Sequence, residues 1–384
     1  MENVSLSRSR PVVRHQRQDI DDKPFIVIWE VTRACQLACA HCRASAIPRR
    51  DPRELTTDEG RALLDTIASF PKPHPIVVLT GGDPFERDDL EELVAHGTGL
   101  GLSVALSPSV TPNLTEGRLA ALREAGGKAV SLSLDGARPE VHDAFRGFEG
   151  THAATLATAK LVRDAGFRLQ VNSTVTAGTV GELPELLAQV LDLGAALWSV
   201  FFLVPTGRGD ALKSLSAYEV EQVLHWLVDV SRFIAIKTTE APHYRRVVIQ
   251  RAKGGQPVDG KLYRVLTTRT AEILVGREVR ERPARPPIDV NSGRGFVFID
   301  HHGLVYPSGF LPFVAGDVHD TSLVDIYRND ETMRRLRRPA TFGGHCGVCE
   351  YAEVCGGSRS RAYALTGDPF AADASCILNV ETTG

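Results

Sequence analysis

The chain has 384 residues, a formal net charge of −3, and 43% hydrophobic and 24% charged residues. These values are ordinary for a soluble globular protein, and the length suffices for one large domain with an appendage. The small negative charge, without a long basic run, argues against a nucleic-acid scaffold, because phosphate binding needs clustered Lys and Arg. No apolar stretch approaches the roughly 20 residues that span a bilayer.

The seven cysteines form two groups, with none between Cys42 and Cys346. Disulfide frameworks do not usually leave such a gap, and seven is an odd number, so both groups indicate metal sites in a reducing compartment. Residues 1–24 are rich in Arg and Ser but lack the apolar core of a secretory signal. We therefore expect a disordered N-terminal tail and a cytoplasmic protein.

Short apolar runs alternate with amphipathic stretches through the first half of the chain. The runs are rich in Val, Ile and Leu, as expected of parallel strands buried on both faces. Helical patterns lie between them, for example the capping box formed by Thr56 and Glu59. These βα units predict either a barrel-like sheet or an open doubly wound sheet, and both place ligands beyond the carboxyl ends of the strands. The expected strands are residues 25–31, 76–80, 102–106, 128–134, 167–175 and 196–204.

The second half of the chain has a different pattern. A helix is expected over residues 216–233 and a short strand over 234–238. Residues 253–294 are rich in Gly, Arg and Pro, which is typical of a surface excursion or linker. Residues 293–309 predict a β-hairpin that turns at His302 and Gly303. A helix over residues 322–338 then leads into the second cysteine group.

The first cysteine group is Cys35, Cys39 and Cys42, spaced C-x3-C-x2-C directly after the first expected strand. Iron–sulfur cubanes normally take four thiolates, so three thiolates on one loop would leave one iron open. With His41 as a fourth ligand, the same loop would instead form a zinc site. That alternative is disfavoured because a ring between Cys39 and Cys42 would reach inward beside both of them only with difficulty.

This loop resembles the signature of the radical S-adenosylmethionine (SAM) enzymes. The resemblance implies a partial (β/α)6 barrel over residues 25–235, of the α/β class. It implies that Cys35, Cys39 and Cys42 hold a [4Fe-4S] cluster whose open iron binds SAM. Reductive cleavage of SAM then gives a 5′-deoxyadenosyl radical that abstracts a substrate hydrogen, with an electron from a flavodoxin- or ferredoxin-type donor. His41 stands where the family often has an aromatic residue near the adenine.

The segment "LTGGDPF" resembles the Gly-Gly-Glu-Pro motif of this family, with Asp83 in place of Glu. The resemblance implies that Gly81, Gly82, Asp83 and Pro84 meet the methionine amino group of SAM. Glycines also let a backbone approach a ligand closely. The alternative is an ordinary turn between a strand and a helix, where such sequences are common.

Three further segments carry candidate SAM contacts. "SLSLDG" resembles the family's Ser-x-Asp-Gly segment, which implies that Ser133 helps to hold SAM and that Asp135 faces the pocket. Asn172 lies in an apolar strand, where a polar side chain either binds a ligand or is satisfied within the core. Leu203 ends the sixth expected strand, where the family packs an apolar backbone against adenine.

The second cysteine group has the spacing C-x2-C-x5-C-x20-C, which by itself allows a zinc ion or a cubane. It resembles the SPASM extension of radical SAM enzymes, which implies an α+β iron–sulfur domain over residues 295–384. Ser308 stands where that pattern has a cysteine, so one auxiliary [4Fe-4S] cluster is expected, as an electron relay or a structural staple. Its four ligands are Cys346, Cys349, Cys355 and Cys376.

Five segments together carry a further resemblance: "WEVTRAC", "HCRASA", "APHYRR", "YPSGFLP" and "CEYAEVCGGSRSRAYA". They resemble the haem-synthase branch of the family (haem d1 and alternative haem biosynthesis), which oxidatively decarboxylates porphyrin propionates. A carboxylate substrate favours Arg partners such as Arg33 and Arg245. His243 and Tyr244 would line the pocket or bind haem iron, or else begin a surface helix. Residues 236–294 are then expected to form a linker and substrate lid.

Two other functions stay open. A radical SAM maturase of a ribosomally made peptide is the main alternative, so the expected substrate is a small molecule or a peptide. A non-enzymatic zinc or iron–sulfur protein is more remote, because it would leave "LTGGDPF" and "SLSLDG" without a purpose.

Overall fold

The computed structural model describes residue 13 and residues 19–380, so most of the expected N-terminal tail lies outside the described residues. A single mixed sheet forms its centre. The strands follow one another in the order β10-β9-β8-β1-β2-β3-β4-β5-β6-β7. They are β1 (Ile26–Glu30), β2 (Ile76–Thr80), β3 (Ser103–Leu106), β4 (Ala129–Ser133), β5 (Arg168–Val175), β6 (Leu197–Phe202), β7 (Ile236–Thr239), β8 (Phe296–Ile299), β9 (Leu304–Tyr306) and β10 (Gly316–Asp317).

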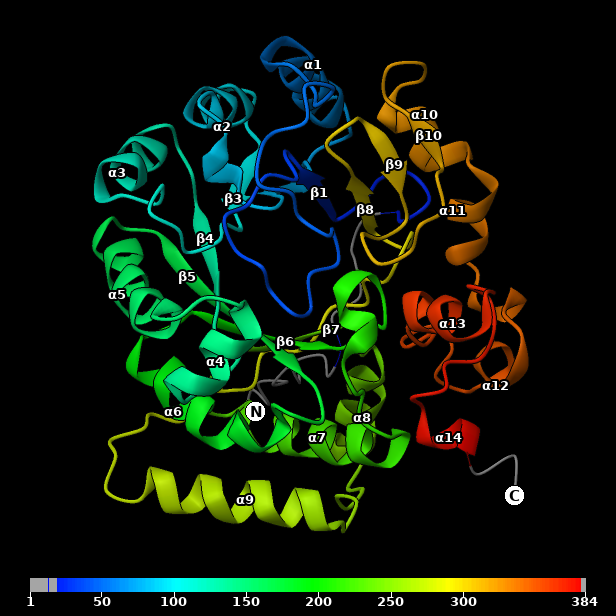
Figure 1. Ribbon diagram of the computed structural model, residues 1–384. Coiled ribbons are helices and arrows are strands. Elements are labelled where there is room, and N and C mark those ends of the chain that lie inside the picture. Colours follow the sequence, from blue (N-terminus) through cyan, green and yellow to red (C-terminus); the bar gives the residue numbers. More distant parts are fainter. Residues whose placement is uncertain (1–12, 14–18, 381–384) are drawn as a thin grey trace, which may run out of the picture.

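Helices cover the outside of the curved sheet (Figure 1). In the barrel they are α1 (Thr57–Ala68), α2 (Leu90–Gly99), α3 (Glu116–Glu124), α4 (Pro139–Arg146), α5 (Thr151–Asp164), α6 (Leu183–Asp192), α7 (Ala217–Val230), α8 (His243–Ala252) and α9 (Lys261–Leu274). The C-terminal helices are α10 (Leu323–Asn329), α11 (Glu331–Leu336), α12 (Gly344–Val348), α13 (Arg359–Thr366) and α14 (Ile377–Val380). Short 3₁₀ turns are η1 (Pro84–Glu86), η2 (Val180–Glu182), η3 (Gly207–Ala211) and η4 (Pro339–Thr341).

The sheet is parallel from β8 through β1 to β7, and only the β9 and β10 pairings are antiparallel. β7 and β10 stand at the two ends of the strand order, so the sheet curves without closing. This is the partial barrel of the α/β class that the resemblance implied. The strand expected over residues 234–238 and the first strand of the expected hairpin extend this barrel, because β7 pairs with β6 and β8 pairs with β1.

The two faces of the strands differ in burial. In β2, Val77 and Leu79 are fully buried, whereas Ile76, Val78 and Thr80 are only partly buried. The buried set faces the helices, as shown by Trp29 of β1, whose ring lies against Gly60 of α1. The expectation of strands buried on both faces therefore holds fully for the outer face and only in part for the inner face. Side chains on the inner face keep part of their surface accessible, as suits a wall around a ligand site.

The segment after β6 continues the barrel. Helix α9 packs beneath α6 and α7, and Trp226 Nε1 donates a hydrogen bond to Thr270 Oγ1 at 3.0 Å. The Gly- and Pro-rich segment expected to be a surface excursion thus contains a helix of 14 residues. Only Leu266 and Thr270 of that helix are buried, which is why its apolar pattern was too weak to predict it.

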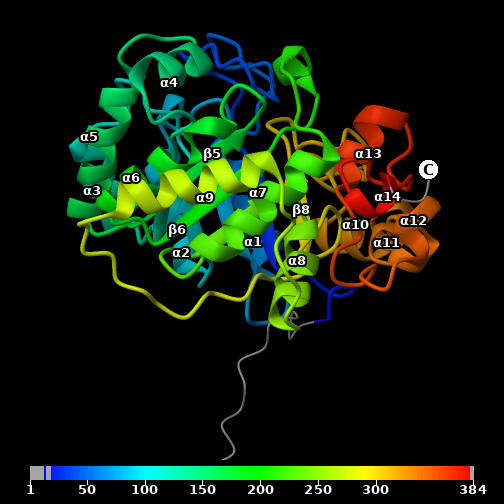
Figure 2. The same ribbon diagram turned by 90° about the horizontal axis from the view of Figure 1, so that it is seen from below.

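The expected hairpin is present as β8 and β9, with Gly303 in the left-handed region at φ 89°. Helices α10–α14 gather at one side of the barrel (Figure 2). Among the described residues, no helix combines the length and apolar character that crossing a membrane requires.

Candidate active site

The loop that carries Cys35, Cys39 and Cys42 connects β1 to α1 at the carboxyl edge of the sheet. Its backbone is held from three directions. Cys35 N donates to Ile47 O at 2.9 Å within the loop, and Ala40 N donates to Phe145 O of α4 at 2.8 Å. From the segment after β6, Arg208 Nε donates to Cys39 O at 2.9 Å. The three thiols are therefore carried on a loop with fixed geometry.

Each of these sulfur atoms accepts an N–H group. Leu37 N lies 3.4 Å from Cys35 Sγ, and Ala46 N lies 3.5 Å from Cys42 Sγ. Burial raises the pKa of the Cys35 thiol, so its thiolate needs a positive partner at neutral pH. Bound iron provides that charge, and N–H groups directed at the sulfurs are a feature of iron–sulfur sites. Three free thiols with such donors fit a cluster that keeps one iron open.

The third sulfur is bonded by a buried arginine that the sequence analysis missed. Arg146, near the end of α4, places Nη1 3.6 Å from Cys39 Sγ, and its Nη2 forms an ion pair with Asp135. The Asp135 carboxylate also accepts from Thr174 N at 2.7 Å. Burial alone would raise the pKa of Asp135, but the Arg146 guanidinium holds that pKa below its ordinary value. Asp135 therefore acts on the cysteine loop through Arg146.

His41 lies over the ring of Phe145, with centroids 4.5 Å apart and planes 18° apart. Burial lowers the pKa of His41 to about 4, so the ring is neutral at pH 7. Its Nδ1 is buried and has no hydrogen-bond partner among the described residues. A neutral, stacked ring with a polar atom to spare is compatible with a planar ligand beside the cysteine loop.

The glycines of "LTGGDPF" are required by the cysteine loop itself. A Cβ atom on Gly81 would come within 2.4 Å of Thr32 O, and one on Gly82 within 2.2 Å of Ala34 O. The backbone pairs tightly here, since Gly82 N donates to Thr32 O at 2.8 Å and Asp83 N donates to Ala34 O at 2.7 Å. The end of β2 thus sits directly on the chain that leads into Cys35.

Asp83 and Pro84 begin the turn η1. The Asp83 side chain is completely buried and accepts hydrogen bonds from Phe85 N at 3.1 Å and Thr111 Oγ1 at 2.7 Å. A third donor, Ser109 N, lies 3.3 Å away. Burial raises the pKa of Asp83 to about 6. These contacts give the carboxylate a role in ordering two loops, and a contact with SAM remains a prediction.

The other predicted SAM contacts lie along the carboxyl edge of the sheet. Ser133 of β4 is paired in register with Asn172 of β5, and both are partly buried. Gln170 Nε2 donates to Asn172 Oδ1 at 2.7 Å, so the amide has one neighbour within its own strand. Leu203 follows β6, and its carbonyl accepts from Arg361 Nη2 at 3.1 Å. The structure brings these residues to the same edge as the cysteine loop.

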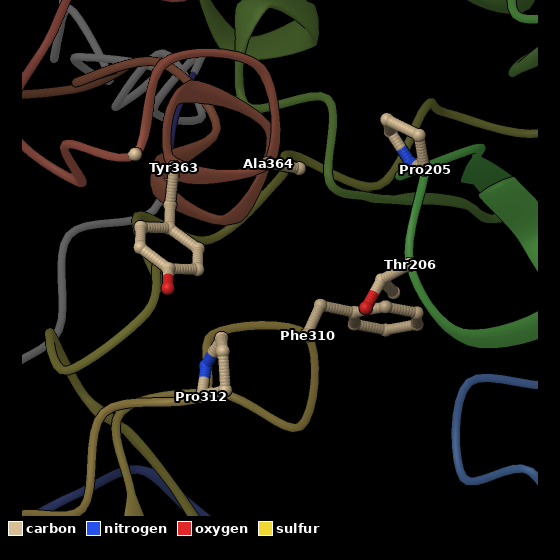
Figure 3. Close-up of a pocket in the computed structure, with 7 residues that line it drawn as sticks. Pro205, Thr206, Phe310, Pro312, Tyr363 and Ala364 are labelled. Carbon is tan, nitrogen blue, oxygen red and sulfur yellow. The ribbon is translucent and has the colours of Figure 1, made fainter.

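A pocket of about 360 Å³ lies beside this edge (Figure 3). Its lining comes from three segments: Pro205 and Thr206 after β6, Phe310 and Pro312 after β9, and Tyr363 of α13 with its neighbours. In Figure 3 the ring of Tyr363 projects toward Pro312, and the ring of Phe310 lies near Thr206. The lining combines aromatic and proline rings with polar groups such as Thr206, and the volume is within the range of small-molecule sites.

This pocket adjoins the first cysteine loop. Gly207, next to Thr206, is so close that a Cβ atom would come within 2.6 Å of Cys42 O. On the other side, a Cβ atom on Gly309, next to Phe310, would come within 3.2 Å of Arg43 Nε. A molecule in the pocket would therefore lie near the cysteine loop.

The second cysteine group surrounds a small cavity. Cys346, Cys349, Cys355 and Cys376 all line it. Sulfur atoms here also accept backbone N–H groups, from Tyr351 to Cys349 at 3.4 Å and from Gly357 to Cys355 at 3.5 Å. Burial raises the pKa of Cys355 to about 11 and that of Cys376 to about 12. Four converging thiols with N–H donors fit a fully ligated metal centre.

Two of the predicted substrate residues of α8, His243 and Arg245, lie beside this second group. His243 Nε2 is 3.1 Å from Asp373 Oδ2, and Arg245 Nη1 donates to Val290 O at 2.7 Å. Burial raises the pKa of Tyr244, and all three side chains are almost wholly buried. Arg33 instead lies near the first group, where its Nη2 donates to Ser45 O at 3.0 Å. Substrate contact by these four residues remains a prediction.

Glu240 is a further residue that the sequence analysis did not single out. It follows β7 with φ 57°, an unusual conformation for a non-glycine residue. Its carboxylate accepts from Ser360 Oγ at 3.0 Å and from Ser308 Oγ at 3.4 Å. Its backbone carbonyl accepts from Arg361 Nη1 at 2.9 Å. Ser308, which replaces a cysteine of the SPASM pattern, thus belongs to a polar network between the barrel and α13.

Comparison with known proteins identifies the family. A sequence model of the radical SAM superfamily matches residues 29–193. The AdoMet-dependent heme synthase of Methanosarcina barkeri is 38% identical over 359 residues, which cover 92% of this chain and 96% of that protein. The chain belongs to the radical SAM superfamily. The AdoMet-dependent heme synthase of Oleidesulfovibrio alaskensis is 40% identical over 91% of this chain and 86% of its own length.

More distant relatives have other names. Mycofactocin maturase MftC of Mycolicibacterium smegmatis is 30% identical over 93% of this chain and 83% of that protein. Among solved structures, Streptococcus suis SuiB bound to S-adenosylmethionine superposes with a TM-score of 0.68 at 14% identity. The match covers 93% of this chain and 78% of that one, which supports the radical SAM fold along the described chain.

Membership of the family makes the chain a radical SAM enzyme that uses SAM and a [4Fe-4S] cluster. When bound, these cofactors supply a 5′-deoxyadenosyl radical for hydrogen abstraction. The protein contributes a three-thiol loop held by hydrogen bonds, N–H donors to its sulfurs, and an adjoining pocket.

Proposed function

We propose that this radical SAM enzyme oxidatively decarboxylates propionate side chains of a porphyrin. The observation that carries the proposal is the similarity to two AdoMet-dependent heme synthases, which extends over more than nine-tenths of this chain. Each propionate that becomes a vinyl group loses one hydrogen atom, one electron and CO₂. The hydrogen atom leaves with 5′-deoxyadenosine, and the electron passes to an acceptor.

Cys35, Cys39 and Cys42 are the proposed ligands of the SAM-binding cluster. Three observations support this assignment: the spacing of the cysteines, their shared loop and the N–H group directed at each sulfur. The proposed SAM contacts are the backbone of residues 81–84, His41, Ser133, Asn172 and Leu203. These groups share the carboxyl edge of the sheet, where parallel α/β folds bind their ligands.

The pocket beside Cys42 suits the proposed substrate. Phe310, Pro312 and Tyr363 offer flat apolar surfaces for a macrocycle. Arg43, which stacks on the ring of Phe298 at 4.6 Å and lies close to Gly309, is a candidate cation for a propionate. It forms an ion pair with Glu30, so a propionate would compete with that buried carboxylate.

We also propose that Cys346, Cys349, Cys355 and Cys376 hold an auxiliary [4Fe-4S] cluster. Its full set of thiolates leaves no open iron, which favours electron relay or structural support over substrate activation. An external one-electron donor of the flavodoxin or ferredoxin type would complete the cycle. Anaerobically reconstituted protein should contain about eight irons and eight sulfides per chain, from two four-iron clusters.

Turnover with defined substrates tests the proposed reaction. The reconstituted enzyme is incubated with SAM, dithionite and either iron-coproporphyrin III or a candidate precursor peptide. The expected result is a porphyrin product that has lost CO₂ and two hydrogens per propionate, with matching 5′-deoxyadenosine. Modification of the peptide alone would instead support a peptide maturase, the function suggested by the name of the 30%-identical mycofactocin relative.

A further inference from the structure

A cluster of three possible metal ligands lies where the barrel meets the C-terminal unit, which begins at residue 295. The cluster consists of Asp51, His301 and His302. Asp51 lies between the cysteine loop and α1, and the two histidines follow β8, at the same edge of the sheet as the end of β1. Each of the three residues offers one ligand atom, and these atoms lie within 4.8 Å of one another. Two imidazoles and a carboxylate therefore converge, although Asp51 precedes the two histidines by some 250 positions in the chain.

His301 is oriented as metal-binding histidines usually are. Its Nδ1 lies 3.0 Å from Glu30 Oε1, and its side chain is only 5% exposed. The Glu30 carboxylate, which is also paired with Arg43, accepts the hydrogen bond at this contact, so Nδ1 of His301 carries a proton. The lone pair is then on Nε2, which is buried and has no hydrogen-bond partner among the described residues. Carboxylate–histidine–metal arrangements have this form.

His302 and Asp51 complete the group. His302 Nε2 lies 3.3 Å from Asp51 Oδ2, and the two histidine rings lie with centroids 3.9 Å apart and planes at 42°. Arg53 also bonds Asp51, with Nη2 2.7 Å from Oδ2. The Arg53 Nε and backbone N each donate to Asp51 Oδ1 at 3.0 Å as well, so a metal would share this carboxylate with an arginine whose side chain is 75% exposed.

We propose that Asp51, His301 and His302 bind a divalent transition-metal ion, at a site separate from both cysteine groups. Two imidazoles and one carboxylate suit Zn²⁺ or Fe²⁺, and three protein ligands leave at least one coordination position open. Metal bonds of roughly 2.0–2.2 Å require the ligand atoms to approach more closely than 4.8 Å. Asp51 and His302 are only partly buried, so they have room for that movement.

The position of the site gives the metal a structural consequence. Leu55 N donates to His301 O at 2.9 Å, so the segment that contains Asp51 already touches the turn after β8. A metal bound to both would fasten the C-terminal unit to the segment that follows the cysteine loop. Glu30, which orients His301, also pairs with Arg43 of that loop, so the site is mechanically connected to the first cysteine group.

Zinc binding to the cluster-loaded full chain tests this proposal. The protein is dialysed anaerobically against graded Zn²⁺, and zinc per chain is measured by mass spectrometry at matched iron content. One zinc per chain is expected in the wild type. Asp51→Asn and His302→Ala should each weaken binding at least tenfold, because each loses a direct ligand. These partly buried residues are chosen over His301 because their replacement is less damaging to folding.

His319→Ala is the matched control. His319 is a 43% exposed histidine that bonds Asp317 at 2.6 Å without belonging to the group. The His319→Ala variant should bind zinc as the wild type does. X-ray absorption of the zinc-loaded wild type should show only nitrogen and oxygen neighbours around the zinc. Equal affinity in all four proteins, no zinc in the wild type, or sulfur neighbours around the zinc would each overturn the proposal. The readout needs no turnover, so it is independent of the porphyrin reaction.

Discussion

The two cysteine groups of this protein differ in ligand number and in surroundings. The first has three thiols on one loop at the carboxyl edge of the sheet, next to a pocket of about 360 Å³. The second has four thiols around a small cavity, flanked by α8 and α13. Both give their sulfurs N–H donors, so those donors do not distinguish them. The difference lies in the missing fourth thiol and the adjoining pocket.

This difference assigns different work to the two sites. A three-thiol site needs a ligand from outside the protein. The neighbouring pocket would let both that ligand and a substrate reach the site. A four-thiol site is complete, and His243 and Arg246 of α8 line the cavity that its sulfurs surround. The three-thiol group (the open site) is therefore expected to carry out the chemistry. The four-thiol group (the closed site) is expected to transfer electrons or to stabilise the fold.

Loss of one ligand at the open site should give the largest effect. Cys39→Ala should abolish formation of 5′-deoxyadenosine from SAM and dithionite, since two thiolates do not retain the cluster. Iron content should fall from about eight to about four per chain. Chromatography of the nucleoside and an iron assay measure both results. Undiminished cleavage would show that Cys39 is not a ligand of the SAM-binding cluster.

The same substitution at the closed site should separate the two functions. Cys349→Ala should also remove about four irons. It should retain substrate-independent cleavage of SAM, because the three-thiol loop makes its contacts with α4 and the segment after β6. Porphyrin turnover should fall strongly if the second cluster relays the electron and only slightly if it is structural. Complete loss of SAM cleavage would remove the distinction between the sites.

Arg146 offers a way to sharpen the comparison, because it acts on the open site alone. Arg146→Met removes the cation beside Cys39 and leaves Asp135 buried without its partner. Breaking a buried pair costs about 3–5 kcal/mol, so the unfolding free energy should fall by about that much. The reduction potential of the first cluster should also fall, since a positive charge and a hydrogen bond to sulfur favour the reduced state.

Redox titration followed by electron paramagnetic resonance measures that potential. Arg146→Lys retains the charge and should restore part of the shift, whereas the signal of the second cluster should be unchanged in both variants. An unaltered potential in Arg146→Met would limit Arg146 to a structural role through Asp135.

The contrast between Cys39 and Arg146 shows what the sequence could and could not predict. The cysteine loop was predictable because its spacing is local and it follows an apolar run that forms β1. The Arg146 contact joins positions 107 residues apart, and nothing in the local sequence around Arg146 indicates it. Helix α9 was missed because only two of its side chains are buried. The α8 residues looked accessible in sequence, yet the C-terminal unit covers them.

The carboxylates of the two sites should respond to pH differently, which gives the smallest expected effect. Burial raises the pKa of Asp83 at the open site to about 6, above its unfolded value, so its contribution to stability declines as the pH rises through 6. At the closed site, His243 and Arg361 overcome burial and hold the pKa of Asp373 far below its ordinary range. Asp373 therefore stays ionised, and its contribution is constant near neutral pH.

Substitution of each carboxylate by its amide tests this contrast in urea unfolding at pH 5 and pH 7.5. On going from pH 5 to pH 7.5, the wild type should lose about 1 kcal/mol of unfolding free energy relative to Asp83→Asn. The variant has no ionisable group at position 83, so it lacks this pH dependence. Relative to Asp373→Asn the wild type should show no such change, although that variant should be less stable throughout because its cationic neighbours lose their partner. Parallel pH profiles for the wild type and Asp83→Asn would mean that Asp83 ionises normally. Its three hydrogen-bond donors would then offset the whole cost of burying the charge.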